Sequence, residues 1–337
     1  MGDTFVYRLG FFFFRDSKNQ KMTAQTSVLP AFIHEGAETA ISLMHNLLAA
    51  NTRRAYASAL RKLDTALQGQ ELTDRTLAAY VGFIAREGLT PASAAMVLAA
   101  VKHRAESLGL QSPAGKLTQD ALGGFRRQAA RRPAPRGQAQ AVTVADATAM
   151  LEAAFKPRPR GRGGMESRET AKRRGIVDAA IVAVLFQGGL RRCEAAALTW
   201  ADIENAADGE GVLIHVRASK SNQEGAAADT RYVKGGFAAA LRRLRIERGP
   251  IRNQANKPVF ALGDQQIGRR FTATAKAAGI SGRITAHSGR VGLASELTRR
   301  GASITETMLA GGWKTARMVA HYSAGATAER GAVAKYL

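Results

Sequence analysis

The chain reads TAHSGRVGLASELTRRG at residues 285–301 and AGGWKTARMVAHYS at residues 310–323, and these two segments are its most informative part. His287 and Arg290 are spaced to share one face of a helix, where both could bind one phosphate. A guanidinium suits phosphate because its planar fork donates two parallel hydrogen bonds and stays charged. Such a pair on its own is common by chance.

Two aromatic residues follow this pair. The two glycines before Trp313 favour a tight turn that could present the indole to a cleft. Tyr322 follows a polar helix, and the Ser-Ala-Gly after it predicts that the helix ends there. Taken one at a time, a tryptophan is normally a core residue and a tyrosine a half-buried packing residue.

The composition indicates a polyanionic partner. The chain has 337 residues, enough for two domains of roughly 100–200 residues each. It contains 49 Lys and Arg against 27 Asp and Glu, a net charge of +22. This excess is spread along the whole length instead of forming one basic tail, which favours nucleic-acid binding over a merely basic surface.

Several classes of protein are disfavoured. Cys193 is the only cysteine, so no internal disulfide can form, and we expect it to be a small buried packing residue. No Cys/His cluster predicts a structural zinc site. No apolar run reaches the roughly 18 residues of a membrane span, and the aromatic run at 5–14 lacks a signal-peptide cleavage site. We therefore expect a cytoplasmic protein that does not contact membranes, with Met22 a possible alternative start.

Composition and periodicity divide the chain into four parts. Residues 1–34 lack periodicity and are predicted to be disordered, and residues 35–131 are predicted to form a helical bundle. Residues 132–143 are rich in proline and arginine, a composition that indicates a linker. Residues 144–337 form a second domain, predicted to be mostly helical with a small antiparallel β-sheet. The fold class is therefore mainly α.

Capping residues predict where helices begin in the bundle. Thr52, Thr73 and Thr90 each precede a helical pattern, and Pro91 suits the first position of its helix. A fourth helix is predicted from 117 to 131.

In the second domain, Asp146 is predicted to cap the first helix. The basic Gly/Pro-rich segment 156–174 reads either as a solvated loop or as a phosphate-tracking loop that is mobile until DNA binds. A buried apolar helix follows at 176–187, and GVLIHVRASK and TRYVKG alternate like two strands around a polar turn. The rest, from about Gly236, is predicted to be helical.

The order of residues is more informative than any one of them. Arg191 lies in GGLRRCEAA after the buried helix, and Lys220 lies at the turn between the strands. With the histidine–arginine pair, the tryptophan and the tyrosine, this pattern resembles the tyrosine recombinase, or phage integrase, family. The resemblance is specific from about residue 185 to the C-terminus and weaker but collinear over 36–130, which looks like the family's core-binding domain.

The resemblance assigns roles to particular residues. Arg191 and Arg290 would clamp the scissile DNA phosphate, and Glu194 would orient a neighbour. Tyr322 would attack phosphorus to give a 3′-phosphotyrosyl intermediate and a free 5′-hydroxyl, so resealing needs no ATP. His287 would accept or orient the phenolic proton.

The resemblance leaves two alternatives open for each of two further roles. Lys220 would protonate the leaving oxygen, with Lys234 as its competitor. Trp313 would donate its indole N–H to the phosphate or pack against the tyrosine. No carboxylate cluster of the two-metal type is visible, so neither a metal nor another cofactor is expected.

The implied partners are a duplex carrying a specific inverted-repeat site and further copies of the chain. The tail ATAERGAVAKYL resembles a segment that docks on a neighbouring subunit, which implies a tetramer that exchanges strands through a Holliday junction. No small-molecule substrate is expected. Candidate DNA-contacting residues are Arg53, Arg54, Ser58, Lys102, Arg104, Gln265, Arg269 and Arg270. Two alternatives are a type IB topoisomerase and a non-catalytic DNA-binding protein on the same scaffold.

Overall fold

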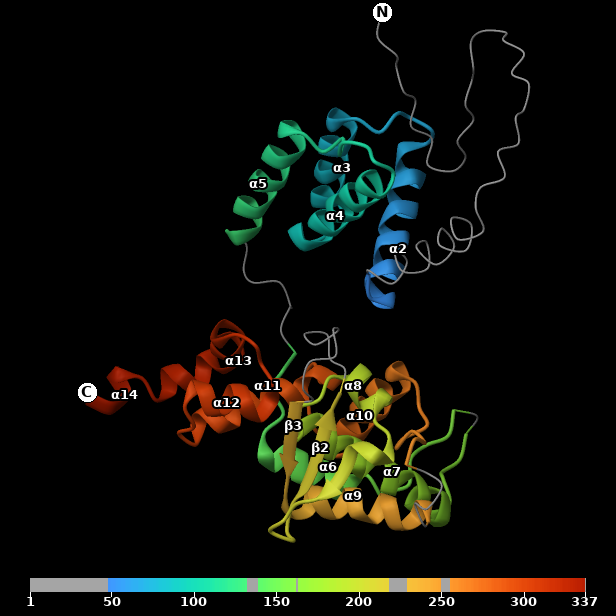
Figure 1. Cartoon of the computed structure of the whole chain (residues 1–337), viewed down its shortest axis with the longest axis vertical. Helices are drawn as coiled ribbons and strands as arrows, with labels where there is room; N and C mark the ends of the chain where they lie inside the picture. Colours follow the sequence, from blue (N-terminus) through green and yellow to red (C-terminus); the bar gives the residue numbers. More distant parts are fainter. Residues whose placement is uncertain (1–47, 132–138, 162, 218–228, 250–254, 337) are drawn as a thin grey trace, which may run out of the picture. The chain divides into compact units, whose positions relative to one another are not determined.

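The computed structural model describes residues 48–131, 139–161, 163–217, 229–249 and 255–336. The chain divides into two compact units, Met1–Arg136 and Gly137–Leu337 (Figure 1). The predicted disordered segment 1–34, most of the predicted linker and Lys220 lie outside the described residues. Within the described ranges, no helix combines the length and apolar character that crossing a bilayer requires.

The N-terminal unit is a bundle whose described helices are α2 (Ala50–Leu67), α3 (Asp74–Arg86), α4 (Pro91–Ser107) and α5 (Lys116–Ala130). Its core is formed by apolar side chains recurring at helical spacing, including the fully buried Leu63 and Leu77 and the nearly buried Val101. Helix α3 packs on α5, and α2 packs on α4.

Two of the predicted helix starts in this unit are confirmed and one is wrong. Thr73 accepts a hydrogen bond from the backbone N–H of Thr76, and Thr90 caps α4 with Pro91 at its first position. Thr52 does not cap α2, because that helix already begins at Ala50 and Thr52 lies in its first turn.

Asp74 joins two helices of this bundle. Its carboxylate accepts hydrogen bonds from the backbone N–H groups of Gly115, Leu117 and Thr118 and from the Thr118 hydroxyl. It therefore caps the first turn of α5 from the start of α3, which satisfies donors that a helix N-terminus leaves free.

The first helix of the C-terminal unit begins at a capping box. Thr143, not Asp146, is the cap, and the Asp146 side chain accepts a hydrogen bond from the Thr143 backbone N–H.

The C-terminal unit is mostly helical. The elements are α6 (Val144–Ala153), α7 (Arg168–Phe186), α8 (Arg192–Ala197), a 3₁₀ turn (Trp200–Asp202), β1 (Ile203–Asn205), β2 (Val212–Val216), β3 (Asp229–Val233), α9 (Gly235–Arg248), α10 (Asp264–Ala277), α11 (Ala286–Arg299), α12 (Ile304–Gly311), α13 (Ala316–Glu329) and α14 (Ala332–Tyr336).

The described strands form one antiparallel sheet in the order β1-β2-β3. Ile214 in the middle strand pairs with Ile203 on one side and Arg231 on the other. The alternating patterns in the sequence predicted β2 and β3, whereas β1 has only three residues and was not predicted. The prediction of a mainly α chain with one small antiparallel sheet is confirmed.

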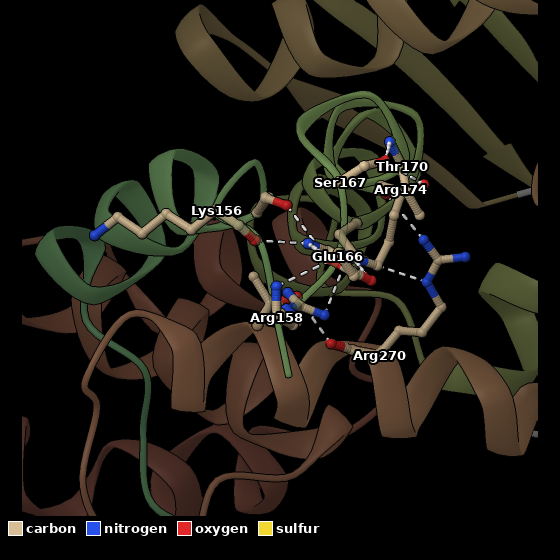
Figure 2. Close-up of polar contacts among 10 residues, drawn as sticks. Lys156, Arg158, Glu166, Ser167, Thr170, Arg174 and Arg270 are labelled. Atoms are coloured by element: carbon tan, nitrogen blue, oxygen red, sulfur yellow. Dashed lines mark hydrogen bonds and ion pairs between the residues drawn. The ribbon is translucent and has the colours of Figure 1, made fainter. Parts of the chain in front are cut away.

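A buried ion cluster fixes the segment before α7 (Figure 2). The Asp178 carboxylate on α7 has no exposed surface, and ion pairs join it to Arg158 at 3.0 Å, Arg174 at 2.8 Å and Arg270 at 2.5 Å. Glu166 also pairs with Arg174 at 2.8 Å.

These contacts correct the prediction that residues 156–174 form a loop, whether solvated or phosphate-tracking. Ser167 caps α7, so the last part of the segment is helical. Pro159 and Met165 form an antiparallel bridge, and Arg158 donates to Thr274 of α10 at 2.9 Å. The base of the segment is therefore anchored to both helices.

Candidate active site

The site begins where α7 ends. Gly189 adopts a left-handed conformation with φ +60°, and the chain then turns into α8 with Arg191 at its N-cap position. Arg191 Nη1 donates to Glu194 Oε1 at 2.5 Å, while the other oxygen of Glu194 accepts from the Arg191 backbone N–H at 2.8 Å. The Glu194 side chain is buried, and the Arg191 side chain is 29% exposed. A buried acid thus orients a cation that still reaches solvent.

Arg290 on α11 is buried at the centre of the site, with 1% of its surface exposed. Its Nη1 donates to the carbonyls of Gly189 and Gly311, both at 2.5 Å, and its Nη2 lies 3.5 Å from the carbonyl of Gly312. Burial, and then the charge of Arg191, lowers the pKa of Arg290 to about 10, which still leaves it charged near neutral pH. The guanidinium therefore ties the end of α7 to the end of α12.

Trp313 follows the end of α12. Gly312 ends that helix in the left-handed region with φ +61°, which a glycine adopts without strain. The Trp313 side chain is 4% exposed, and Arg290 Cζ lies 4.3 Å from its ring centroid, a cation–π contact. Its Nε1 is buried and has no hydrogen-bond partner among the described residues.

Tyr322 lies within α13, not at a helix end as the sequence predicted. Its phenolic oxygen is 3.1 Å from His287 Nε2, and the two rings meet edge to face. Its backbone carbonyl accepts from the Ser295 hydroxyl of α11 at 3.1 Å, and Ser323 is buried and bonds to the Val319 carbonyl. These contacts outweigh the loop tendency of Ser-Ala-Gly.

The His287 imidazole can act as a proton acceptor. Burial, reinforced by the charges of Arg290 and Arg191, lowers the pKa of His287 below its usual value. The ring is therefore neutral at neutral pH, and Nε2 can accept from the Tyr322 hydroxyl when the ring proton is on Nδ1.

The structure thus brings together Arg191, Glu194, His287, Arg290, Trp313 and Tyr322 within the C-terminal unit. Lys234 is exposed, and its backbone N–H donates to the side chain of Gln187 at the end of α7 at 2.6 Å.

Residues 165–329 match the model of the phage integrase family. This region belongs to the phage integrase family. A comparison with curated proteins finds no match.

Solved structures share the fold at low identity. A XerH site-specific recombinase, bound to palindromic difH substrate in a post-cleavage complex, is 16% identical with a TM-score of 0.59, and the match covers 84% of this chain and 79% of that one. The Tn1549 transposon integrase in complex with transposon right end DNA is 16% identical with a TM-score of 0.54, over 86% and 97% of the two chains. A lambda integrase tetramer bound to a Holliday junction is 16% identical with a TM-score of 0.51, over 86% and 76%.

One buried residue beside this site was not predicted from the sequence. Arg231 on β3 is 4% exposed and packs against Gly312, where an added Cβ would collide with its guanidinium. The alternation of the strand could have revealed it, because positions 231 and 233 share the buried face.

The candidate DNA-contacting residues of the N-terminal unit lie on α2 and α4. Arg53 and Arg54 are exposed on α2, where Ser58 is half-buried. Lys102 and Arg104 are exposed on α4, and Lys102 lies 3.7 Å from the carboxylate of Glu106.

In the integrase domain, Gln265 and Arg269 are exposed on α10 and lie 3.5 Å apart. Arg270 does not share that exposed face. Its guanidinium bonds to Asp178 and to the Arg174 carbonyl, so it anchors α10 to α7. The expectation that Cys193 is buried is also wrong, because this thiol is exposed. No group of three or more metal-ligating His, Cys, Asp or Glu side chains occurs in the described ranges.

Proposed function

We propose that the protein is a site-specific DNA recombinase in which Tyr322 is the nucleophile. The observation that carries the proposal is the 3.1 Å contact between the Tyr322 hydroxyl and a neutral His287, in a site that also holds two arginines. A phenol with an unperturbed pKa of about 10 needs an acceptor to become a nucleophile at neutral pH.

The arginines would supply the electrostatic stabilisation. Attack on a phosphodiester adds negative charge to the non-bridging oxygens, and fixed guanidiniums can stabilise that charge without reorganising. Arg290 is fixed by backbone carbonyls, and Arg191 is oriented by Glu194. Charge stabilisation of this kind needs no metal ion.

The proposed steps balance as follows. The phenolic proton passes to His287, a bond forms between Tyr322 Oη and phosphorus, and the bond from phosphorus to the 5′-oxygen breaks. Lys220 protonates that leaving oxygen, and Lys234 is the alternative donor. The 3′-phosphotyrosyl link keeps the energy of the phosphodiester, so a 5′-hydroxyl from another strand can reverse the reaction without ATP.

Strand exchange between two sites would use a tetramer and a Holliday junction. The fold of the integrase domain, the basic composition and the DNA-bound structures that share the fold support this assembly. The bundle at 35–131 would be the core-binding domain, 132–143 the linker, and the exposed Val333 and Tyr336 of α14 would dock on a neighbouring subunit. The target would be an inverted repeat, and the setting a prokaryotic nucleoid or plasmid.

A covalent trap tests this function and finds the target. Nicked duplexes with randomised arms around a short spacer are incubated with the full chain in EDTA, and protein-linked DNA is recovered after SDS treatment and sequenced. We expect an adduct enriched in inverted repeats, and Tyr322→Phe should abolish it. An adduct that persists in Tyr322→Phe, or one that EDTA prevents, contradicts the mechanism. Relaxation of any supercoiled plasmid without sequence enrichment would indicate a topoisomerase instead.

A further inference from the structure

Arg231 is a buried cation with few hydrogen-bond partners. It is 4% exposed on β3, its Nη2 lies 3.3 Å from Asp229 Oδ2, and its Nη1 donates to the Thr230 carbonyl at 3.3 Å. Its Nε is buried and has no partner among the described residues. Because a buried charge is costly unless well paired, its position calls for a role in what it packs against.

Arg231 packs against the turn that carries Trp313. A Cβ at Gly312 would collide with its guanidinium, so the backbone of the turn lies directly against it. On the same turn, Arg290 donates to the carbonyl of Gly311 at 2.5 Å and lies 3.5 Å from that of Gly312. The turn is therefore held by two arginines from different elements.

Asp229 makes a second link to the same turn. Its Oδ2 pairs with Arg231, and its Oδ1 lies 3.6 Å from the Nζ of Lys314, the residue after Trp313. The carboxylate is 20% exposed, so solvent only partly screens these pairs. The Asp229 side chain thus connects β3 to Lys314, directly after the turn, and to Arg231, which packs against Gly312 within it.

We propose that Asp229 and Arg231 are positioning residues for the cleavage step, and that they act by fixing the Gly311–Trp313 turn. This inference rests on the proposed function. Neither residue would touch the reacting atoms. Their effect would pass through Trp313 and Arg290, whose ring and guanidinium lie 4.3 Å apart and depend on the same turn. Small displacements of a phosphate-binding group slow a reaction strongly even when binding is kept.

The test compares Arg231→Met, Arg231→Lys and a control, Arg248→Met, which removes an exposed arginine at the end of α9. The duplex recovered in the covalent trap serves as the DNA. We expect Arg231→Met to lower the single-turnover adduct rate by at least about 10-fold while the Kd for the duplex changes less than about 2-fold. Arg231→Lys, which keeps the charge, should recover part of the rate, and Arg248→Met should match the wild type.

The fluorescence of Trp313, measured without DNA, provides a second test of the proposal. The chain has two tryptophans, so Trp200→Phe leaves Trp313 as the reporter. In that background, Arg231→Met should shift the Trp313 emission to longer wavelength as the turn loosens, and Arg248→Met should not. Wild-type emission together with a wild-type adduct rate in Arg231→Met would overturn the proposal.

A second pair of variants covers the case in which Arg231→Met does not fold. Asp229→Asn and Lys314→Met act at partly exposed positions of the same bridge. The double variant should be no slower than Asp229→Asn alone, because the two residues act through one contact; fully additive losses would contradict the proposal. If the wild type gives no Tyr322-dependent adduct, the proposed function fails, whereas the emission of Trp313 still tests the positioning.

Discussion

His287 Nε2 lies 3.1 Å from the hydroxyl oxygen of Tyr322, although the two residues are 35 positions apart and belong to different helices, α11 and α13. This contact joins the proposed nucleophile to a neutral imidazole that can accept its proton. It predicts a particular pH dependence.

The adduct rate should depend on the protonation of His287. The pKa of His287 lies below its ordinary value of about 6.5, and only the neutral ring accepts a proton. In single-turnover assays, the wild-type rate should stay level as the pH falls to about 6.5 and decline only below that value. His287→Gln should lower the rate by about 100-fold and remove the acidic decline. An unchanged acidic decline in this variant would assign the titration to another group.

Trp313→Phe should separate packing from hydrogen bonding. The variant keeps a ring beside Arg290 and removes a buried N–H that has no partner among the described residues. Loss of the unpaired donor offsets part of the cost of the cavity that the smaller ring leaves, so we expect the thermal midpoint to fall only slightly. The adduct rate should fall, by about 100-fold if the indole donates to the phosphate in the DNA complex. A wild-type rate would show that Trp313 only packs.

Asp178→Asn should destabilise the C-terminal unit. It leaves Arg158, Arg174 and Arg270 without the fully buried carboxylate that they share, which should cost about 3–5 kcal/mol in urea unfolding. Glu169→Gln is the matched control, because the Glu169–Arg173 pair on the same helix is mostly exposed and should contribute less than about 1 kcal/mol. Equal losses of unfolding free energy in the two variants would show that burial of the ion cluster does not add to stability.

Asp74→Asn should weaken the N-terminal bundle only where Asp74 is ionised. Hydrogen bonds from the Thr118 hydroxyl and from backbone N–H groups hold the pKa of Asp74 below its usual value. A lowered folded-state pKa stabilises above the unfolded value of about 3.9, and this stability is lost as the pH falls through the folded value. The variant's lower thermal midpoint at about pH 7 should therefore approach that of the wild type in strong acid. A difference in thermal midpoint that is the same at every pH would show that the ionisation of Asp74 does not contribute to stability.

Local signals predicted much of the fold. Thr73 and Thr90 were recognisable as caps because capping depends on a side chain and the backbone three residues on. The same signals were ambiguous where neighbours compete. Thr52 lies just inside a helix that starts earlier, and Asp146 is the second member of a capping box that Thr143 opens.

Long-range contacts explain what the sequence did not reveal. Arg270 meets Asp178 across 92 positions, and nothing near either residue in the sequence predicts that pair. Arg290 likewise reaches Gly189 across 101 positions. The order of the site residues carried the family resemblance. The alternation of β3 places Arg231 on the buried face of the strand, whereas its contact with the turn at Gly312 depends on long-range packing.

Helix α13 is regular from Ala316 to Glu329, and α14 extends from its end (Figure 1). Tyr322 therefore lies about 10 Å along the helix axis from the C-terminal end of α13. Two contacts tie this end of α13 to α11, the helix that carries His287: Arg299 pairs with Glu329 at 3.1 Å, and Arg330 donates to the Thr298 carbonyl at 2.6 Å. The phenol and the imidazole are thus held together twice, by their own contact and by the joint between their helices just before the tail.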